Sequence, residues 1–244
     1  VAVYHRNKPG QDASVELPSG RYAKCWDYSA ANPANGERIH ISTVRTLPEG
    51  ANPDTPQTYW RQTGMAYALS VDDGKSFGPL RPLVKQGAEY TPEHPFDGLW
   101  HGKNQVYGIY EPLFLDDRRF LVPLEMSVLE ADGKTIYNPL GWDFSQVVVL
   151  IGKRDGEGCV WDSSQPLRAD FHKQSTRGLC EPTVGRLADG RVLMVMRGSN
   201  HSKPEMRSYK WASLSADGGK TWSAAVPWTY DDGTPFFSPS SISK

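Results

Sequence analysis

Charged residues flank three apolar segments of the chain at matching positions. When the segments are aligned on Leu17, Leu115 and Leu187, a carboxylate stands shortly before each leucine and a charged residue follows ten residues after it. The preceding residues are Asp12, Glu111 and Glu181, and the following ones are Asp27, Glu125 and Arg197. Carboxylates move protons and activate nucleophiles, and the planar guanidinium of arginine binds a carboxylate through two hydrogen bonds. This residue set predicts a site with acid–base chemistry and one place for an anionic group.

Each aligned segment has the pattern of a β-hairpin, which would position these charges. The turn sequences Pro-Ser-Gly at 18–20, Asp-Asp-Arg at 116–118 and Ala-Asp-Gly at 188–190 each divide two apolar stretches. Such residues favour hairpin turns. The second stretch of the latter two hairpins is apolar almost throughout, which is typical of strands buried on both faces. Sheets stacked radially bury strands in this way, and the strand ends then meet on one face around a common pocket.

A second motif recurs with the form Ser-x-Asp-x-Gly-x-Ser/Thr-aromatic. Ser70–Phe77 and Ser215–Trp222 both fit it, and Asp155–Trp161 is a poorer copy with one extra residue. The Asp is expected to accept backbone N–H groups across its own turn, and Gly supplies a backbone conformation that other residues resist. We expect the aromatic ring to be buried against a sheet. The motif is therefore predicted to be structural and to lie on the outer side, away from the pocket.

Together these repeats predict an all-β fold, a β-propeller of four-stranded antiparallel blades within a single domain, 1–244. The blades are expected at about 8–88, 105–172 and 176–230, and a fourth begins at 235–244. About three and a half blades do not close a ring, and this kind of repeat more commonly forms six. The domain is therefore expected to be incomplete, with a second chain or a missing C-terminal segment completing the propeller.

Composition narrows the function classes. Hydrophobic residues make up 38% and charged residues 23% of the 244, so neither a disordered chain nor a membrane span is expected. The net charge of -1 disfavours a nucleic-acid partner. The three cysteines fit no zinc motif, so no metal site is predicted. No other cofactor is predicted either. The cysteines leave the compartment open, although a secreted or periplasmic location is favoured.

The repeated motif is similar to the Asp-box, or BNR repeat, of the sialidase (neuraminidase) superfamily. The segment from Glu181 to Arg197 also resembles a blade of these proteins. In sialidases a glutamate polarises a tyrosine nucleophile, and an arginine sixteen residues later binds the substrate carboxylate. The resemblance implies these roles for Glu181 and Arg197, and it implies an acid/base aspartate in the first blade. Asp27 and Asp12 are the candidates for that aspartate, together with Asp54 in the long loop 28–58.

The chain departs from the sialidase pattern at several places. It contains no Phe/Tyr-Arg-Ile-Pro segment to supply the first arginine, and the third arginine and the tyrosine nucleophile would fall beyond Lys244. A uronic acid or another acidic sugar would also suit a single arginine. The segment 88–104 could shape the site, since it carries Tyr90, His94, Trp100 and His101, whose rings stack on sugars or titrate near neutrality.

These features predict a sialidase-like exo-glycosidase that hydrolyses a terminal acidic sugar from a glycan. Glu181 would activate the nucleophile or water, and Asp27 or Asp12 would donate the proton. Substrate-binding residues would be Arg197, Glu125, Glu111, Trp100 and His101. One alternative is a polysaccharide lyase of the same fold, with His101 or a tyrosine as base and Arg197 neutralising a uronate. The other is a non-catalytic glycan-binding propeller.

Overall fold

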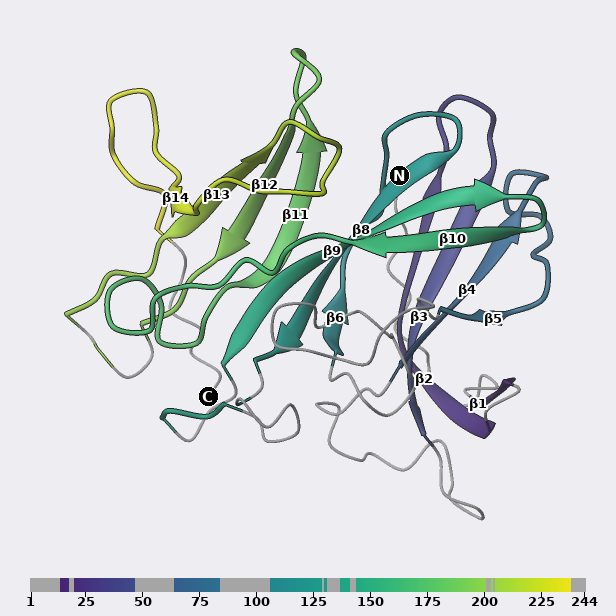
Figure 1. Ribbon diagram of the computed structural model, residues 1–244, viewed down its shortest axis with the longest axis horizontal. Helices are drawn as coiled ribbons and strands as arrows, with labels where there is room; N and C mark the ends of the chain where they lie inside the picture. The colour runs from purple at the N-terminus through teal and green to yellow at the C-terminus, as the bar shows by residue number, and fades with distance from the viewer. Residues whose placement is uncertain are drawn as a thin grey trace.

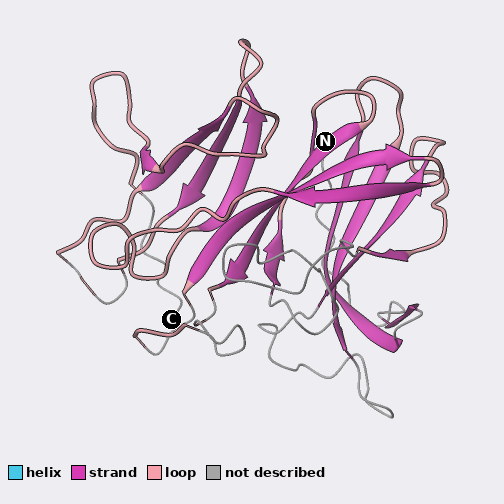
Figure 2. Ribbon diagram, viewed as in Figure 1, coloured by secondary structure: helices cyan, strands magenta, loops and turns pink. Residues whose placement is uncertain are grey.

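The computed structural model describes residues 14–17, 20–46, 64–83, 106–128, 130, 137–140, 144–200, 203 and 205–237. Every regular element in these ranges is a β-strand, and the described part contains no helix (Figure 2). Accordingly, no described segment forms an apolar helix of membrane-spanning length. All strand pairs within the sheets are antiparallel. The prediction of an all-β fold is therefore confirmed.

The strands form three sheets that stand side by side in chain order (Figure 1). The first sheet has the order β1 (Ser14–Leu17), β2 (Gly20–Ala31), β3 (Arg38–Thr46), β4 (Gly64–Ser70), β5 (Arg81–Pro82). The second combines β6 (Val106–Ile109), β7 (Leu113–Phe114), β8 (Arg119–Ser127), β9 (Ser145–Asp155) and β10 (Gly158–Ser163). The third has the order β11 (Cys180–Arg186), β12 (Val192–Arg197), β13 (Lys210–Ser215), β14 (Val226–Pro227).

The strand counts differ from a uniform four. The third sheet has four strands, whereas the first has five, because β1 adds a strand on the side of β2 away from β3. In the second sheet β6 and β7 both pair with β8, and residues 110–112 separate them. These two short strands occupy one position in the sheet, because the first strand of this hairpin is interrupted.

Two apolar cores lie between successive sheets. Phe120, Val122 and Leu124 of β8 pack with Ile39, Ile41, Met65 and Tyr67 of the first sheet. Leu121 of β8 and Val147 of β9 pack instead with Met194, Met196 and Trp211 of the third sheet. Strand β8 therefore contributes to both cores, and its prediction as a doubly buried strand is confirmed. Strand β12 alternates between buried and half-buried residues, so the same prediction is only partly correct there.

The turn at 215–222 has the hydrogen bonding that its sequence predicts. Asp217 accepts the backbone N–H of Thr221 at 2.9 Å and its hydroxyl at 2.6 Å, while Ser215 Oγ accepts the N–H of Gly219 at 2.8 Å. Residues 70–77 repeat this pattern around Asp72. Ser215 pairs with Val192 at one end of β12, and Lys210 pairs with Arg197 at the other. This turn therefore lies at the opposite end of the third sheet from Arg197.

Two of the three copies of the motif differ from these expectations, at Phe77 and at Asp155–Trp161. Phe77 is 41% exposed: its ring meets that of His40 in a T-shaped contact, at 5.7 Å between centroids, and belongs to neither core. Trp222 is partly buried against the second core and donates from Nε1 to the Gly219 carbonyl at 3.0 Å. The third copy, from Asp155, is a two-residue hairpin turn between β9 and β10, since Asp155 pairs with Gly158. Its Gly-Glu turn closes a tight reversal and leaves no room for the longer loop.

Candidate functional site

Glu181 and Arg197 form an ion pair at one end of the third sheet. Strand β11 begins at Cys180, which pairs with Arg197 at the end of β12. Arg197 Nη1 donates to Glu181 Oε1 at 2.7 Å. The arginine side chain is 16% exposed, whereas the glutamate side chain is 45% exposed. The carboxylate thus faces solvent while the arginine side chain is largely covered by protein.

The backbone of Glu181 is strained. Its φ is +48°, in the left-handed region that glycine favours, and a bulge shifts the β11–β12 register between Cys180 and Thr183. A bulge re-aims a side chain out of the alternation of its strand. Residues in this conformation cost about 1–3 kcal/mol, persist only where their surroundings fix them, and gather at functional sites. The strain at Glu181 therefore calls for a feature that holds this backbone in place.

That feature is the buried carboxylate of Glu125 in β8. Its side chain accepts three hydrogen bonds: from Ser145 Oγ at 2.9 Å, from the Tyr110 hydroxyl at 2.9 Å and from the Glu181 backbone N–H at 3.1 Å. Glu125 has 9% exposure. Burying a carboxylate is costly unless it is hydrogen-bonded, and here both oxygens have donors. The hydrogen bond from the Glu181 N–H therefore joins the second sheet to the third at Glu181, whose own carboxylate is exposed.

Burial sets the chemistry of the neighbouring groups. It raises the pKa of Tyr110 far above its ordinary value, and the nearby Glu125 carboxylate adds to the effect, so the phenol remains neutral and donates. Burial likewise raises the pKa of the Cys180 thiol well above its usual range, and Glu125 adds to this, whereas Arg197 and Arg177 oppose it. The Nε atoms of both arginines are buried without a hydrogen-bond partner among the described residues. Two arginines and two glutamates thus surround Cys180, and each arginine retains an Nε–H donor without a partner among the described residues.

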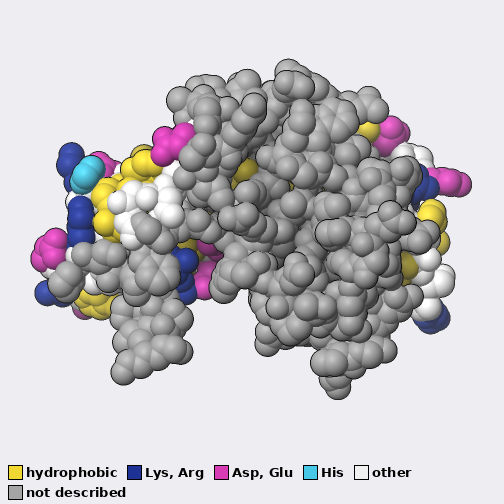
Figure 3. All heavy atoms as spheres, turned by 90° about the horizontal axis from the view of Figure 1, so that it is seen from below, with side chains coloured by type: hydrophobic (Ala, Val, Ile, Leu, Met, Phe, Trp, Pro, Cys, Tyr) yellow, Lys and Arg dark blue, Asp and Glu magenta, His cyan; other side chains and the backbone are white. Residues whose placement is uncertain are grey.

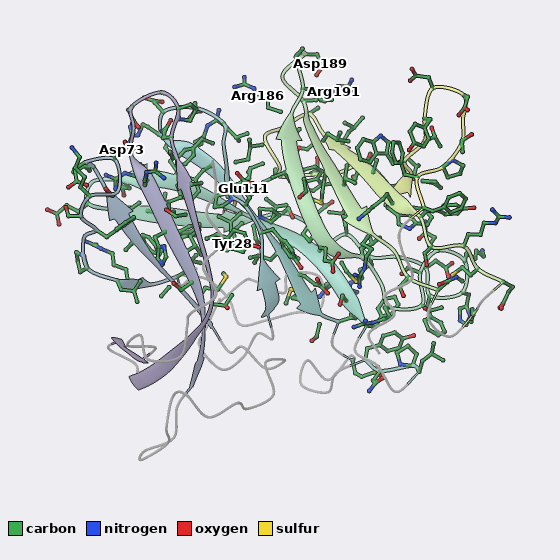
Figure 4. The ribbon with its side chains drawn as sticks, turned by 180° about the vertical axis from the view of Figure 1, so that it is seen from behind. Tyr28, Asp73, Glu111, Arg186, Asp189 and Arg191 are labelled. Atoms are coloured by element: carbon green, nitrogen blue, oxygen red, sulfur yellow. The ribbon has the colours of Figure 1, made fainter. Side chains whose placement is uncertain are left out.

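The remaining predicted residues are placed as follows. Glu111, labelled in Figure 4, is exposed and follows Tyr110, whose ring lies 6.5 Å from that of Tyr28; Glu111 is outside the described contacts that join Glu125, Glu181 and Arg197. The backbone of Asp27 pairs with Ser42 within β2, four residues before this strand ends, so its prediction as a strand-end residue is wrong. A register shift beside Asp27 displaces the alignment with the other hairpins. The Asp27 side chain is outside the described part, as are Asp12, Asp54, Tyr90, His94, Trp100 and His101.

Sequence reasoning missed Tyr110, Ser145 and Cys180. A signal existed for two of them, because the dipeptide Glu-Pro occurs at 111–112 and again at 181–182, with Tyr110 and Cys180 immediately before. Both prolines are buried. Ser145 carries no comparable signal, since it reaches the site only through the pairing of β9 with β8, opposite Ser127.

A groove of about 440 Å³ lies elsewhere, between the 70–77 turn and the β9–β10 hairpin. Phe77, Arg81 and Arg154 are among its lining residues, and Glu125, Glu181 and Arg197 are not. Figure 3 shows acidic and basic side chains interspersed on the described surface at both sides of the molecule. The candidate site is the Glu125–Glu181–Arg197 cluster, because its contacts bring together three of the residues that the sequence predicted.

The chain belongs to the family described as the BNR repeat-like domain, which matches residues 49–236. This match places it in the sialidase-like BNR superfamily that the repeated motif resembles. The family match includes all three residues of the cluster. A short segment of the chain is also similar to a cyanuric acid amidohydrolase from Methylobacterium sp. (strain 4-46). The two are 43% identical over 56 residues, which cover 23% of this chain and 14% of the amidohydrolase.

The chain is similar to several solved structures, to differing degrees. A protein of unknown function from Dyadobacter fermentans is 19% identical, with a TM-score of 0.51, over 84% of this chain and 50% of its own. The Hadza microbial sialidase Hz136 is 16% identical, with a TM-score of 0.46, over 80% of this chain and 36% of its own. The Trypanosoma rangeli sialidase is 11% identical, with a TM-score of 0.38, over 98% of this chain and 45% of its own. The chain thus spans half or less of the length of these proteins.

Proposed function

We propose that this chain is part of a sialidase-like β-propeller glycosidase that removes a terminal acidic sugar from a glycan. The Glu181–Arg197 pair, at 2.7 Å in a member of the BNR repeat-like family, is the observation that carries the proposal. In this reading the three sheets are blades of a six-bladed ring, at about 8–88, 105–172 and 176–230. The rest of the ring would come from elsewhere in the protein or from a second chain.

Arg197 binds the sugar carboxylate in the proposed mechanism. One of its Nη groups is already held by Glu181, and its second Nη group presents further N–H donors in the same plane. A guanidinium fixed in this way is ready to bind an anionic group without reorganising. Its low exposure strengthens the electrostatic attraction, because little water screens it.

Glu181 activates the attacking group. One carboxylate oxygen accepts from Arg197, and the half-exposed side chain leaves the other free to take a proton from a water or a hydroxyl nucleophile. The activated oxygen then bonds to the anomeric carbon of the sugar, the bond from that carbon to the leaving oxygen breaks, and the leaving oxygen takes a proton from Asp27 or Asp12. Trp100, His101 and Glu111 would contact the substrate around this centre.

Substitution of Arg197 tests the proposal on the full-length protein. Arg197→Lys keeps the charge but loses the planar fork, so kcat/KM on an acidic sugar should fall about 100-fold, the low end for loss of one preorganised donor. The loss on a neutral analogue of the same sugar should be much smaller. Arg191→Lys is the matched control, because Arg191 pairs with Asp189 at the exposed tip of the same hairpin (Figure 4) and should leave both activities unchanged.

Two results would contradict the proposal. Equal losses on the acidic and neutral sugars would make Arg197 a structural residue and favour a non-catalytic glycan-binding propeller. Ultraviolet absorbance from a new double bond in the product would identify a lyase. Glu181→Gln should mainly lower kcat, because it removes activation and leaves ground-state binding in place.

A further inference from the structure

We propose that Glu125 is a positioning residue that holds the backbone of Glu181 in its left-handed conformation and so aims the Glu181 carboxylate at Arg197. The catalytic part of this inference rests on the proposed function, whereas the conformational part does not. The contact that carries it is the hydrogen bond from the Glu181 N–H to Glu125 Oε2 at 3.1 Å, between residues 56 apart in the sequence.

The hydrogen bond acts on the one strained residue of the cluster. Glu181 is, with Asp73, one of two non-glycine residues with positive φ in the described part of the chain. An extended backbone at this position would remove the bulge and turn the side chain toward the opposite face of β11, because side chains alternate along a strand. The N–H bond to Glu125 favours the observed φ, and the observed φ brings the carboxylate within 2.7 Å of Arg197 Nη1.

Glu125 is itself fixed from two further directions. Ser145 at the start of β9 donates to Oε1, and Tyr110 between β6 and β7 donates to Oε2. Because Tyr110 is a neutral phenol in a buried setting, it can only donate to the carboxylate while the latter is charged. The orientation of Glu125 is therefore set by the second sheet and imposed on the third.

This arrangement separates Glu125 from the residues that contact substrate. Both of its oxygens are already bound by protein donors and its side chain is buried, while Glu181 and Arg197 form the part of the cluster that reaches solvent. A change at Glu125 should therefore act through Glu181. Glu125→Gln is the sharpest change, since it keeps the shape of the side chain and removes its charge, so the charge-assisted hydrogen bond from the Glu181 N–H becomes at most a weaker neutral one.

Hydrogen exchange of the Glu181 backbone amide tests the conformational part without any substrate. In the full-length protein, Glu125→Gln should raise the exchange rate at Glu181 at least tenfold, read by mass spectrometry with residue-resolved fragmentation. Ser213→Ala is the matched control. It removes another buried hydroxyl hydrogen bond of the third sheet, to Ser223 O at 2.6 Å, and should leave exchange at Glu181 unchanged. Unchanged exchange at Glu181 in Glu125→Gln would overturn the inference.

Steady-state kinetics test the catalytic part. Glu125→Gln should lower kcat on the acidic sugar about 10–100-fold and leave KM within about twofold, because it misplaces the activating group and spares Arg197. Ser213→Ala should leave kcat unchanged even where it lowers the melting temperature. If Glu125→Gln does not fold, Tyr110→Phe removes a single donor to Glu125, and it should raise exchange at Glu181 and lower kcat severalfold. A normal kcat together with faster exchange would refute the catalytic role.

The two proposals fail in different ways. If the unaltered protein releases no sugar while exchange at Glu181 still depends on Glu125, the proposed function falls and the positioning of Glu181 stands. If the unaltered protein is active and exchange is insensitive to Glu125, the positioning falls and the glycosidase stands.

Discussion

The left-handed backbone at Glu181 predicts an unusual order of stability for two substitutions. Glu181→Ala and Glu181→Gly both remove the ion pair with Arg197, and both keep the backbone N–H that donates to Glu125. They differ only in the β-carbon, which is strained at φ +48°. We therefore expect the glycine variant to be the more stable of the two, the reverse of the usual order in a strand.

The size of the difference follows from two opposing terms. A β-carbon in the left-handed region costs about 1–2 kcal/mol, which the glycine variant avoids. Glycine loses more backbone entropy on folding than alanine, which costs about 0.5–1 kcal/mol. The difference in the free energy of unfolding should then be about 0.5–1 kcal/mol in favour of glycine. For a domain of this size it amounts to about 1–4 °C in melting temperature.

Thermal and urea denaturation of the two variants, with a second pair at Thr183, measure this difference. Thr183 is an exposed residue of the same strand, and its φ is not positive. There, alanine should be more stable than glycine by about 0.5–1 kcal/mol, because only the entropy term remains. The difference in stability between alanine and glycine should have opposite signs at Glu181 and Thr183. Because both Glu181 variants lack the ion pair, this comparison does not depend on how much the ion pair contributes. The same order at both positions would refute the claim that the Glu181 backbone is strained.

Three further predictions concern the scaffold. Asp217→Ala should lower the free energy of unfolding by about 1–2 kcal/mol in denaturant titrations, a value discounted for exposure. Burial alone would raise the pKa of Asp217, but hydrogen bonds from Thr221 and Ser215 outweigh it and lower the pKa. The stabilisation by Asp217 should therefore be complete above about pH 4 and be lost as the pH falls below that value, as thermal melts at a series of acidic pH values would show. Phe120→Ala should cost about 3–5 kcal/mol, because the fully buried ring leaves a cavity in the first core; a loss under 1 kcal/mol would contradict that packing. Burial raises the pKa of Cys159 to about 11 and that of Cys180 further, so site-resolved thiol labelling at pH 8 should be slow at both until the protein unfolds.

Much of the hairpin geometry was predictable because it is local. The Ala-Asp-Gly turn sets the pairing of β11 with β12, so the sixteen-residue spacing placed Glu181 and Arg197 at the same end of this hairpin. Their contact also needs the bulge and the left-handed backbone at Glu181. The 215–222 turn closes on its own hydroxyl and carboxylate groups, so its hydrogen bonds also follow from nearby residues. Such features depend on turn chemistry and on the alternation of strands, which a sequence records directly.

Local prediction failed where an irregularity changed the register. The first hairpin aligned well in sequence, yet a shift between Lys24 and Asp27 and four more residues of strand place Asp27 inside β2. Phe77 fits the aromatic position of its motif, yet it is half-exposed beside His40 and does not belong to a core. The extent of a strand and the depth of a ring depend on what packs against them, which the motif does not contain.

The role of Glu125 was decided by tertiary structure alone. The sequence placed a carboxylate at the end of an apolar strand and predicted a substrate contact, a role different from the positioning role proposed above. The stacking of the second sheet on the third brings that carboxylate to the Glu181 N–H, 56 residues away, and Tyr110 and Ser145 join it from separate strand ends. A buried carboxylate must find donors wherever the packed sheets supply them, and no spacing along the chain specifies which donors those are. The sequence therefore determined which charges stand near the strand ends, and the packing of the sheets determined which of them meet, which one faces solvent and which one is held behind it.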